Sequence, residues 1–296
     1  MARLELVRGI FFSKNIYRGE NTTMTSFSQF TRITCISMAL AFGLHGCGGG
    51  GSGGNHFEVP VTPPVASNPL GETRTDSIKS VQADTTYNLR IYLPNGYDAT
   101  KAYPIIYALD GDSNYTTIAG QMDKLQIKAI VVAIGRDELR TRDYNLPGAY
   151  TYYKFLTLDL IPYIEAKYKV AADKRTLEGH SFGGMFVGIA LFLDRKGGRF
   201  FSNFVAQEGT YDIDATTTAT IAQLEQQVFD ASGGQMPVTV ILSDSLQQYF
   251  LMSRGLNDKL KSRNYQGLTL KLMEYNQSHG GMFLDSLTDS LRILFP

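Results

Sequence analysis

One short stretch, Gly179-His-Ser-Phe-Gly183, restricts the fold more than any other part of the sequence. Its Gly-x-Ser-x-Gly spacing is that of a nucleophile elbow, a tight turn between a strand and a helix that exposes a serine hydroxyl. The glycines are needed because side chains beside the strained serine would make the strand and helix collide. A strand is expected over 175–179 and an apolar helix over 184–194. This context favours Ser181 as a nucleophile over an ordinary glycine-rich turn.

The rest of the chain alternates between strand and helix patterns. Continuous apolar runs at 103–109 and 129–134 are typical of strands buried on both faces of a parallel sheet. Further strands are expected at 87–93, 201–206, 237–242 and 268–273, and helices at 114–126, 152–168, 221–229, 247–261 and 284–294. The sequence therefore predicts one α/β domain over residues 71–296, with a mostly parallel, doubly wound sheet and helices on both faces.

The first 70 residues are predicted to lie outside this domain. The apolar run at 33–44 has the length of a signal-peptide core. Leu44-His-Gly-Cys47 resembles the lipobox of bacterial lipoproteins, which implies lipid attachment at Cys47. We expect a signal segment over 1–46, with Met24 as an alternative start, and a Gly/Pro-rich tether over 47–70. The domain would then be held in the bacterial cell envelope through lipid alone, and a plain secretory signal is the alternative.

Composition argues against several functions. The 28 Lys and Arg residues balance 28 Asp and Glu residues, and no basic run contains interspersed aromatic residues, so nucleic-acid binding is not expected. Both cysteines, Cys35 and Cys47, precede the domain, which excludes a disulfide within it. The four histidines lack the spacing of a zinc site. Neither a metal nor another cofactor is expected.

A serine hydroxyl needs a general base within hydrogen-bonding reach. His45 and His56 lie in the signal segment and the tether, and the side chain of His180 is expected to point away from the elbow. His279 remains, in a loop between the last expected strand and the last helix. It is therefore the candidate base and acid of the reaction.

The base needs an orienting acid, and the oxyanion of the intermediate needs backbone N–H donors. Asp244, at the end of the strand expected over 237–242, is the first choice for the acid, although it could instead cap the following helix. Glu208, directly after the strand expected over 201–206, is the second, and a serine–histidine dyad without a strong acid is a further alternative. The oxyanion donors are expected to be the N–H groups of Phe182 and Asp112. The other interpretation of Leu109-Asp-Gly-Asp112 is a simple tight turn.

Five segments together resemble one esterase family of the α/β-hydrolases: Tyr103-Pro-Ile-Ile-Tyr-Ala-Leu-Asp-Gly111, Arg140-Thr-Arg-Asp-Tyr144, Leu160-Ile-Pro-Tyr-Ile-Glu165, Gly179-His-Ser-Phe-Gly-Gly184 and Ser278-His-Gly280. This family includes esterase D-like enzymes, enterobactin-type siderophore esterases, feruloyl esterase domains and mycolyl transferases. The resemblance covers nearly the whole domain and implies that Ser181 is the nucleophile and His279 the base. The sequence differs from the family around residues 243–248, where the usual glycine and acidic cluster are absent.

The predicted activity is that of a serine carboxylic-ester hydrolase that works through an acyl-enzyme. An acyltransferase or a peptidase on the same fold, and a non-catalytic, surface-anchored binding protein, are the alternatives. Arg140 and Arg142 are expected near the mouth of the site, where they could hold an anionic or catechol-like ester. A surface ion-pair cluster is the other interpretation of these arginines.

Overall fold

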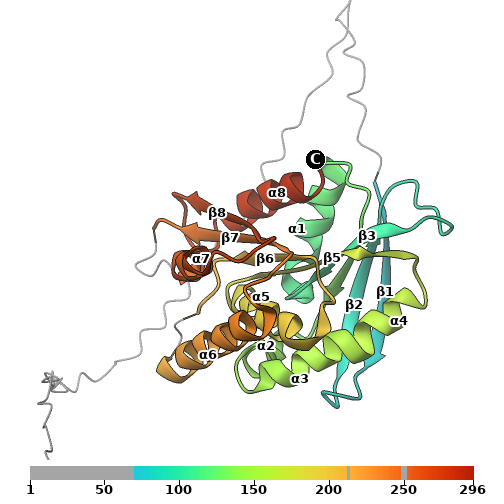
Figure 1. The fold of residues 1–296 in the computed structure, drawn as a ribbon. Helices are drawn as coiled ribbons and strands as arrows, with labels where there is room; N and C mark the ends of the chain where they lie inside the picture. Colours follow the sequence, from blue (N-terminus) through green and yellow to red (C-terminus); the bar gives the residue numbers. More distant parts are fainter. Residues whose placement is uncertain (1–69, 212–213, 248–251) are drawn as a thin grey trace, which may run out of the picture. The chain divides into compact units, whose positions relative to one another are not determined.

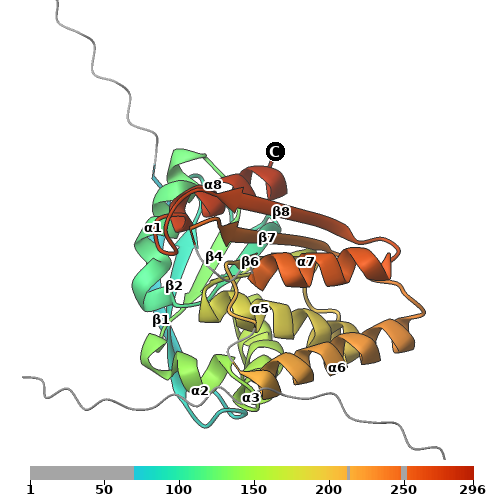
Figure 2. The same ribbon diagram turned by 90° about the vertical axis from the view of Figure 1, so that its left-hand side faces the viewer.

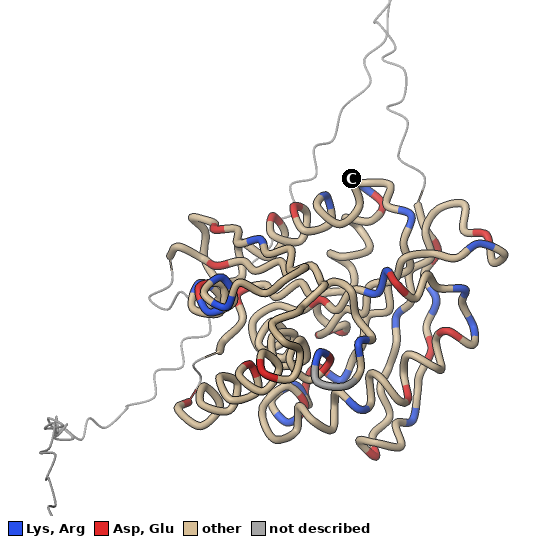
Figure 3. The backbone as a smooth tube through the Cα atoms, in the orientation of Figure 1, with Lys and Arg blue, Asp and Glu red and all other residues tan. Residues whose placement is uncertain are grey.

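A computed structural model describes residues 70–211, 214–247 and 252–296. The predicted signal segment 1–46, Met24, Cys47 and all but the last residue of the tether 47–70 lie outside the described residues. Within the described ranges, no helix has the length and apolar character needed to cross a bilayer. Basic and acidic residues are interspersed along the described chain (Figure 3).

The strands form one eight-stranded sheet in the order β1-β2-β4-β3-β5-β6-β7-β8 (Figure 1). The pairs β1–β2 and β2–β4 are antiparallel, and all the other pairs are parallel. The direction of strand addition reverses between β3 and β5, and in such sheets ligands bind beside the carboxyl ends of the strands at that point. The strands are β1 (Glu72–Lys79), β2 (Thr86–Leu93), β3 (Tyr103–Ala108), β4 (Ile130–Ile134), β5 (Val170–His180), β6 (Asn203–Gln207), β7 (Thr239–Ser245) and β8 (Thr269–Tyr275).

Helices cover both faces of the sheet, as predicted (Figure 2). On one face, α1 (Gly111–Lys124) and α8 (Phe283–Leu294) bury a core that includes Ile118 and Leu287. The other face carries the larger core, into which Phe186 and Leu224 pack. Its helices are α2 (Arg140–Tyr144), α3 (Gly148–Lys154), α4 (Ile161–Glu165), α5 (Phe182–Leu193), α6 (Ala215–Ser232) and α7 (Met252–Arg263). The predicted doubly wound α/β architecture is confirmed.

Three local features differ from the prediction. The edge strand β1 was not expected because Ile78 is its one buried residue, so the sequence shows no alternation. The helix expected over 152–168 is divided into α3, a π-helical turn η2 (Phe155–Leu160) and α4. The short helix α2 and the 3₁₀ turn η1 (Asp137–Leu139) that precedes it were also not predicted.

Candidate active site

Ser181 lies at the sharp turn between β5 and α5, with φ 60° and ψ −118°. This positive φ is costly for a residue with a side chain, and such strain is concentrated at functional sites. The turn is fixed by the Ser181 N–H, which donates to the Gln207 carbonyl at 2.9 Å. A Cβ on Gly179 would lie 2.6 Å from the carbonyl carbon of Gly183, so this position needs glycine. The predicted order of strand, elbow and helix is confirmed.

His279 and Glu208 come together beside this turn. His279 lies in the loop between β8 and α8, and Glu208 directly follows β6. Nδ1 of His279 is 2.9 Å from Oε2 of Glu208, whose side chain is 7 % exposed. Oε2 nevertheless receives no well-directed hydrogen bond from any described residue. The two groups therefore form a close pair in which the imidazole N–H is not aimed straight at the oxygen.

Asp244, the first choice for the acid, does not pair with His279. Its buried carboxylate accepts hydrogen bonds from the N–H groups of Ser253 at 3.1 Å and Arg254 at 2.7 Å, in the first turn of α7. It thus caps that helix, which is the alternative role of the residue. Burial raises the pKa of Asp244, although the two N–H groups oppose this effect. The structure pairs His279 with the second choice, Glu208, and a local sequence pattern does not show which strand end faces the loop after β8.

His180 lies against the His279 loop, whereas the prediction from the sequence is a side chain that points away from the elbow. The ring centroids of His180 and His279 are 4.7 Å apart, and Nε2 of His180 is 3.1 Å from the carbonyl oxygen of His279. Burial lowers the pKa of His180 to about 4, and repulsion by His279 adds to this shift. The ring is therefore neutral at pH 7 and can donate from Nε2 to that carbonyl. His180 supports the position of His279.

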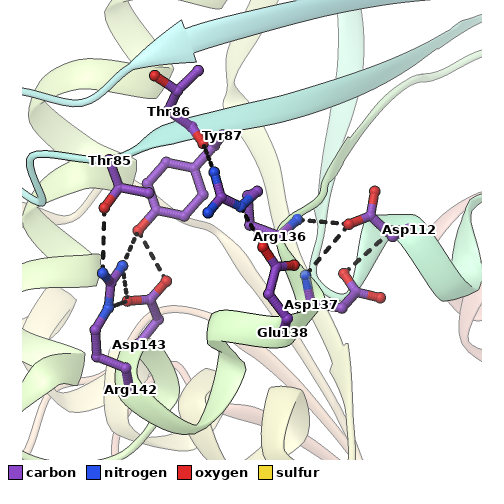
Figure 4. A network of polar contacts seen from close by, with 9 residues as sticks. All are labelled: Thr85, Thr86, Tyr87, Asp112, Arg136, Asp137, Glu138, Arg142 and Asp143. Carbon is purple, nitrogen blue, oxygen red and sulfur yellow. Dashed lines mark hydrogen bonds and ion pairs between the residues drawn. The ribbon is translucent and has the colours of Figure 1, made fainter.

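The turn that precedes α1 faces the elbow. A Cβ on Gly183 would lie 3.1 Å from Oδ2 of Asp110. The backbone of Asp110 is left-handed, with φ 52°, at the turn into α1. The Asp112 N–H, predicted to bind the oxyanion, donates to Oδ1 of Asp137 at 3.2 Å (Figure 4). In return, the Asp112 carboxylate accepts from the Arg136 N–H at 2.7 Å. The Phe182 N–H belongs to the first turn of α5, where N–H groups have no acceptor within the helix.

The two predicted arginines have different surroundings. Nη2 of Arg140 lies 2.9 Å from Oδ2 of Asp110 and 3.4 Å from the His180 carbonyl oxygen. The same guanidinium lies 5.3 Å from the centre of the Phe182 ring. Arg140 thus joins the turn before α1 to the elbow.

Arg142 belongs to a separate polar network. Its guanidinium donates to Oδ1 of Asp143 at 2.7 Å, to the Tyr87 hydroxyl at 3.2 Å and to Oγ1 of Thr85 at 3.3 Å (Figure 4). Tyr87 and Thr85 belong to the start of β2 and the turn before it, so these contacts fasten α2 to the antiparallel part of the sheet. For Arg142, the structure agrees with the ion-pair interpretation.

A family model described as "Putative esterase" matches residues 80–212. The matched residues include the elbow, Glu208 and both arginines, so this part of the chain is similar to that esterase family. The family resemblance seen in the sequence is thereby confirmed, and so is the prediction of a carboxylic-ester hydrolase at the level of the family.

Individual relatives extend over most of the esterase domain. A ferri-bacillibactin esterase, BesA of Bacillus subtilis, is 24 % identical over 243 residues, which is 69 % of this chain and 82 % of the relative. The structure of a BES protein from Bacillus cereus has a TM-score of 0.65 at 22 % identity and covers 79 % of this chain and 97 % of its own. The structure of an IroE-like serine hydrolase from Shewanella oneidensis has a TM-score of 0.64 at 25 % identity, and the match covers 76 % of this chain and 80 % of the hydrolase. These structures share the α/β-hydrolase fold with the esterase described here.

Proposed function

We propose that this chain is a serine esterase in which Ser181 is the nucleophile, His279 the base and Glu208 the acid. The observation that carries the proposal is the 2.9 Å approach of Glu208 Oε2 to His279 Nδ1, next to a serine held at positive φ. A carboxylate at Nδ1 favours the tautomer with hydrogen on Nδ1, which leaves Nε2 free to accept the serine proton. It also stabilises the imidazolium that forms.

The reaction then has two halves. Ser181 attacks the ester carbonyl while His279 accepts its proton, and the tetrahedral oxyanion collapses as His279 protonates the departing alcohol. Water, deprotonated by His279, next attacks the acyl-enzyme, and the carboxylic acid leaves as the proton returns to Ser181. The Phe182 N–H supplies one oxyanion donor. If the Asp112 N–H supplies the other, the oxyanion must displace the Asp137 carboxylate that this N–H now faces.

The proposed substrate class is a siderophore-type ester with anionic or catechol groups. The name of the Bacillus subtilis relative, ferri-bacillibactin esterase, supports this choice. The Arg140 side chain, 31 % exposed, adds a positive charge beside the elbow, although its own hydrogen bonds go to Asp110 and the His180 carbonyl. The same site would allow acyl transfer if an alcohol took the place of water, but no feature of the described residues favours that outcome.

We also propose that a lipid on Cys47 holds the esterase in the cell envelope. The support is the sequence of the lipobox-like segment, Leu44-His-Gly-Cys47. Metabolic labelling with a palmitate analogue should mark the wild-type chain and leave Cys47→Ser unmarked. Equal labelling of both chains would reject the anchor.

The catalytic proposal is tested with p-nitrophenyl acetate and a fluorophosphonate probe. The wild-type protein should turn over the ester and bind the probe covalently. Ser181→Ala should lose both, with a fall in kcat of about 10³-fold or more. The control is Ser262→Ala, which removes an exposed hydroxyl and should behave as wild type. Equal activity of Ser181→Ala and wild type would refute the proposed nucleophile.

The substrate class is tested with siderophore lactones, feruloyl sugars and short acyl esters. We expect the highest kcat/KM for the siderophore lactones. A preference for either of the other classes would reject the proposed substrate while leaving the mechanism intact. The same assays with added acceptor alcohols would reveal acyl transfer as new ester products.

A further inference from the structure

Three side chains at the carboxyl edge of the sheet form a group of a kind that can hold a metal ion. His180 ends β5, Glu208 follows β6, and His279 lies in the loop after β8. Each offers one ligand atom, and these atoms all lie within 4.8 Å of one another. Two imidazole nitrogens and one carboxylate oxygen are a donor set found in zinc sites.

A second observation concerns the carboxylate of this group. Glu208 is 6 % exposed, and its Oε2 accepts no well-directed hydrogen bond from the described residues, although His279 Nδ1 is 2.9 Å away. A buried carboxylate oxygen without a directed donor is unfavourable unless a cation or another donor reaches it. This oxygen belongs to the group of ligand atoms that lie within 4.8 Å of one another, so a cation among them would reach it.

We propose that Zn²⁺ binds between His180, Glu208 and His279 and inhibits the esterase. Zn²⁺ lies about 2.0 to 2.2 Å from nitrogen and oxygen ligands, so neighbouring ligand atoms in a tetrahedral site are about 3.3 Å apart. The widest pair of the group, at up to 4.8 Å, therefore has to close by roughly 1.5 Å. We assign this movement to the His279 side chain, which is 38 % exposed. Water completes the coordination.

Zn²⁺ would block the base through its tautomer. The His279 nitrogen that faces Glu208 is Nδ1, so the metal takes the place of the hydrogen on Nδ1. The neutral ring then carries that hydrogen on Nε2, and no proton is gained or lost overall. Nε2 can no longer accept the proton of Ser181. Inhibition thus rests on the proposed role of His279, whereas metal binding does not.

Binding is measured in metal-free, full-length Ser181→Ala protein by calorimetry with Zn²⁺ and by the visible spectrum with Co²⁺. We expect one ion per chain and a four-coordinate Co²⁺ spectrum. Adding His180→Gln, which keeps a donor for the His279 carbonyl, should weaken binding by about tenfold or more, since even the loss of a residue that only supports a metal ligand costs 10- to 100-fold. Adding His56→Gln, in the tether, is the control and should leave the affinity unchanged. No binding, or equal binding after His180→Gln, would overturn the site.

Inhibition is measured with Ser181 intact, and each variant is compared with its own metal-free rate. Zn²⁺ should inhibit the wild type reversibly, with recovery on addition of EDTA, and Mg²⁺ should have no effect because it prefers oxygen ligands. His180→Gln should need about tenfold more Zn²⁺ for half inhibition. Zn²⁺ that binds without slowing turnover would overturn the inhibitory role and argue against His279 as the base. Failure of the serine mechanism itself would appear separately, as turnover that survives Ser181→Ala.

Discussion

Glu208 and Asp244 show how the backbone decides what a buried carboxylate does. They lie at the carboxyl ends of the neighbouring strands β6 and β7. At Glu208 the chain turns to φ 47°, held by its N–H, which donates to the Ser243 carbonyl at 2.8 Å, and the side chain meets His279. At Asp244 the strand continues, and the carboxylate reaches the N-terminus of α7. One carboxylate faces His279 and the other caps a helix.

Exchanging each carboxylate for its amide should separate these roles. Glu208→Gln removes the charge that stabilises the imidazolium and should lower kcat by about 10² to 10⁴-fold with the fold intact. Asp244→Asn weakens a helix cap and should cost about 1 kcal/mol of unfolding free energy, with kcat changed by no more than a few fold. Ester turnover and urea unfolding of both variants check this. A collapse of kcat in Asp244→Asn alone would restore Asp244 as the acid.

Arg140 should act by holding the turn before α1. Burial raises the pKa of Asp110 to about 6, and the charge of Arg140 is the largest effect that opposes the rise. In Arg140→Gln the pKa of Asp110 should rise further, so this carboxyl takes up a proton near neutral pH. The bridge that Arg140 forms between Asp110 and the His180 carbonyl is lost as well. We expect kcat of Arg140→Gln to fall by about tenfold, which corresponds to roughly 1.4 kcal/mol. Arg140→Lys, which keeps the positive charge, should retain part of the lost kcat.

The matched control for Arg140 is Arg142→Gln on the same short helix. Its contacts lie with Thr85, Tyr87 and Asp143, so this change should lower stability and leave kcat near the wild-type value. The prediction for Arg140 concerns kcat rather than KM. If Arg140→Gln raised KM alone, Arg140 would be a substrate contact and not a positioning residue.

At the scale of elements, the strands and helices that could be predicted from the sequence are those whose burial leaves a regular apolar pattern. The apolar runs at 103–109 and 129–134 identified β3 and β4 because both faces of these strands are buried. Within 152–168, a regular helix would have put Leu158 on the buried face with Phe155 and Ile161. The π-helical turn shifts that phase, so Leu158 is 54 % exposed while Phe155 and Ile161 are buried.

The same distinction applies to the candidate site. The elbow could be predicted because Gly179, Ser181 and Gly183 determine it locally. The pairing of Glu208 with His279 could not, because it depends on how β6 and the loop after β8 meet in space. In the sequence, Glu208 and Asp244 both follow an apolar strand, and no local pattern shows which of the two will face His279.

The strand and helix of the elbow should tolerate no side chain at Gly179. The Cβ of Gly179→Ala would lie 2.6 Å from the backbone of Gly183, so β5 and α5 would have to separate. We expect a loss of about 1 to 3 kcal/mol of unfolding free energy together with most of the activity. Gly120→Ala is the control, because this site in α1 has open space and alanine should stabilise the helix by about 0.5 to 1 kcal/mol. Thermal unfolding in which Gly179→Ala matches the wild type would contradict the close packing at Gly179.

At the scale of the whole molecule, a buried polar group joins the central strands to α8. The side-chain amide nitrogen of Gln207 faces Glu178 and donates to its Oε1 at 2.7 Å. The amide oxygen of Gln207 accepts from the Leu287 N–H at 2.8 Å. The Ser286 and Ser243 hydroxyl oxygens, 2.7 Å apart, extend the group to β7. The loop that carries His279 leads directly into α8. The protonation of Glu178 therefore affects the packing of the helix that follows the proposed base.

The stability of the esterase should fall with rising pH because of Glu178. Burial raises the pKa of this carboxyl from 4.5 to about 8, and the charge of Asp110 adds to the shift. Between these values the folded protein holds a proton that the unfolded chain has released. The contribution of Glu178 is thus complete below pH 4.5 and is lost as the pH rises to about 8, by up to about 1.4 kcal/mol per pH unit.

Glu178→Gln keeps this group neutral at every pH and isolates its effect. The variant should gain stability over the wild type steadily from pH 5 to pH 8, as measured by urea unfolding at each pH. Glu72→Gln is the control, since the pKa of this exposed carboxyl on β1 lies below its usual value through its bond to Arg74, and its effect should not vary over the same range. A constant difference between Glu178→Gln and the wild type would mean that Glu178 is already ionised in the folded protein. The buried group under α8 would then need a cation rather than a proton to balance its charge.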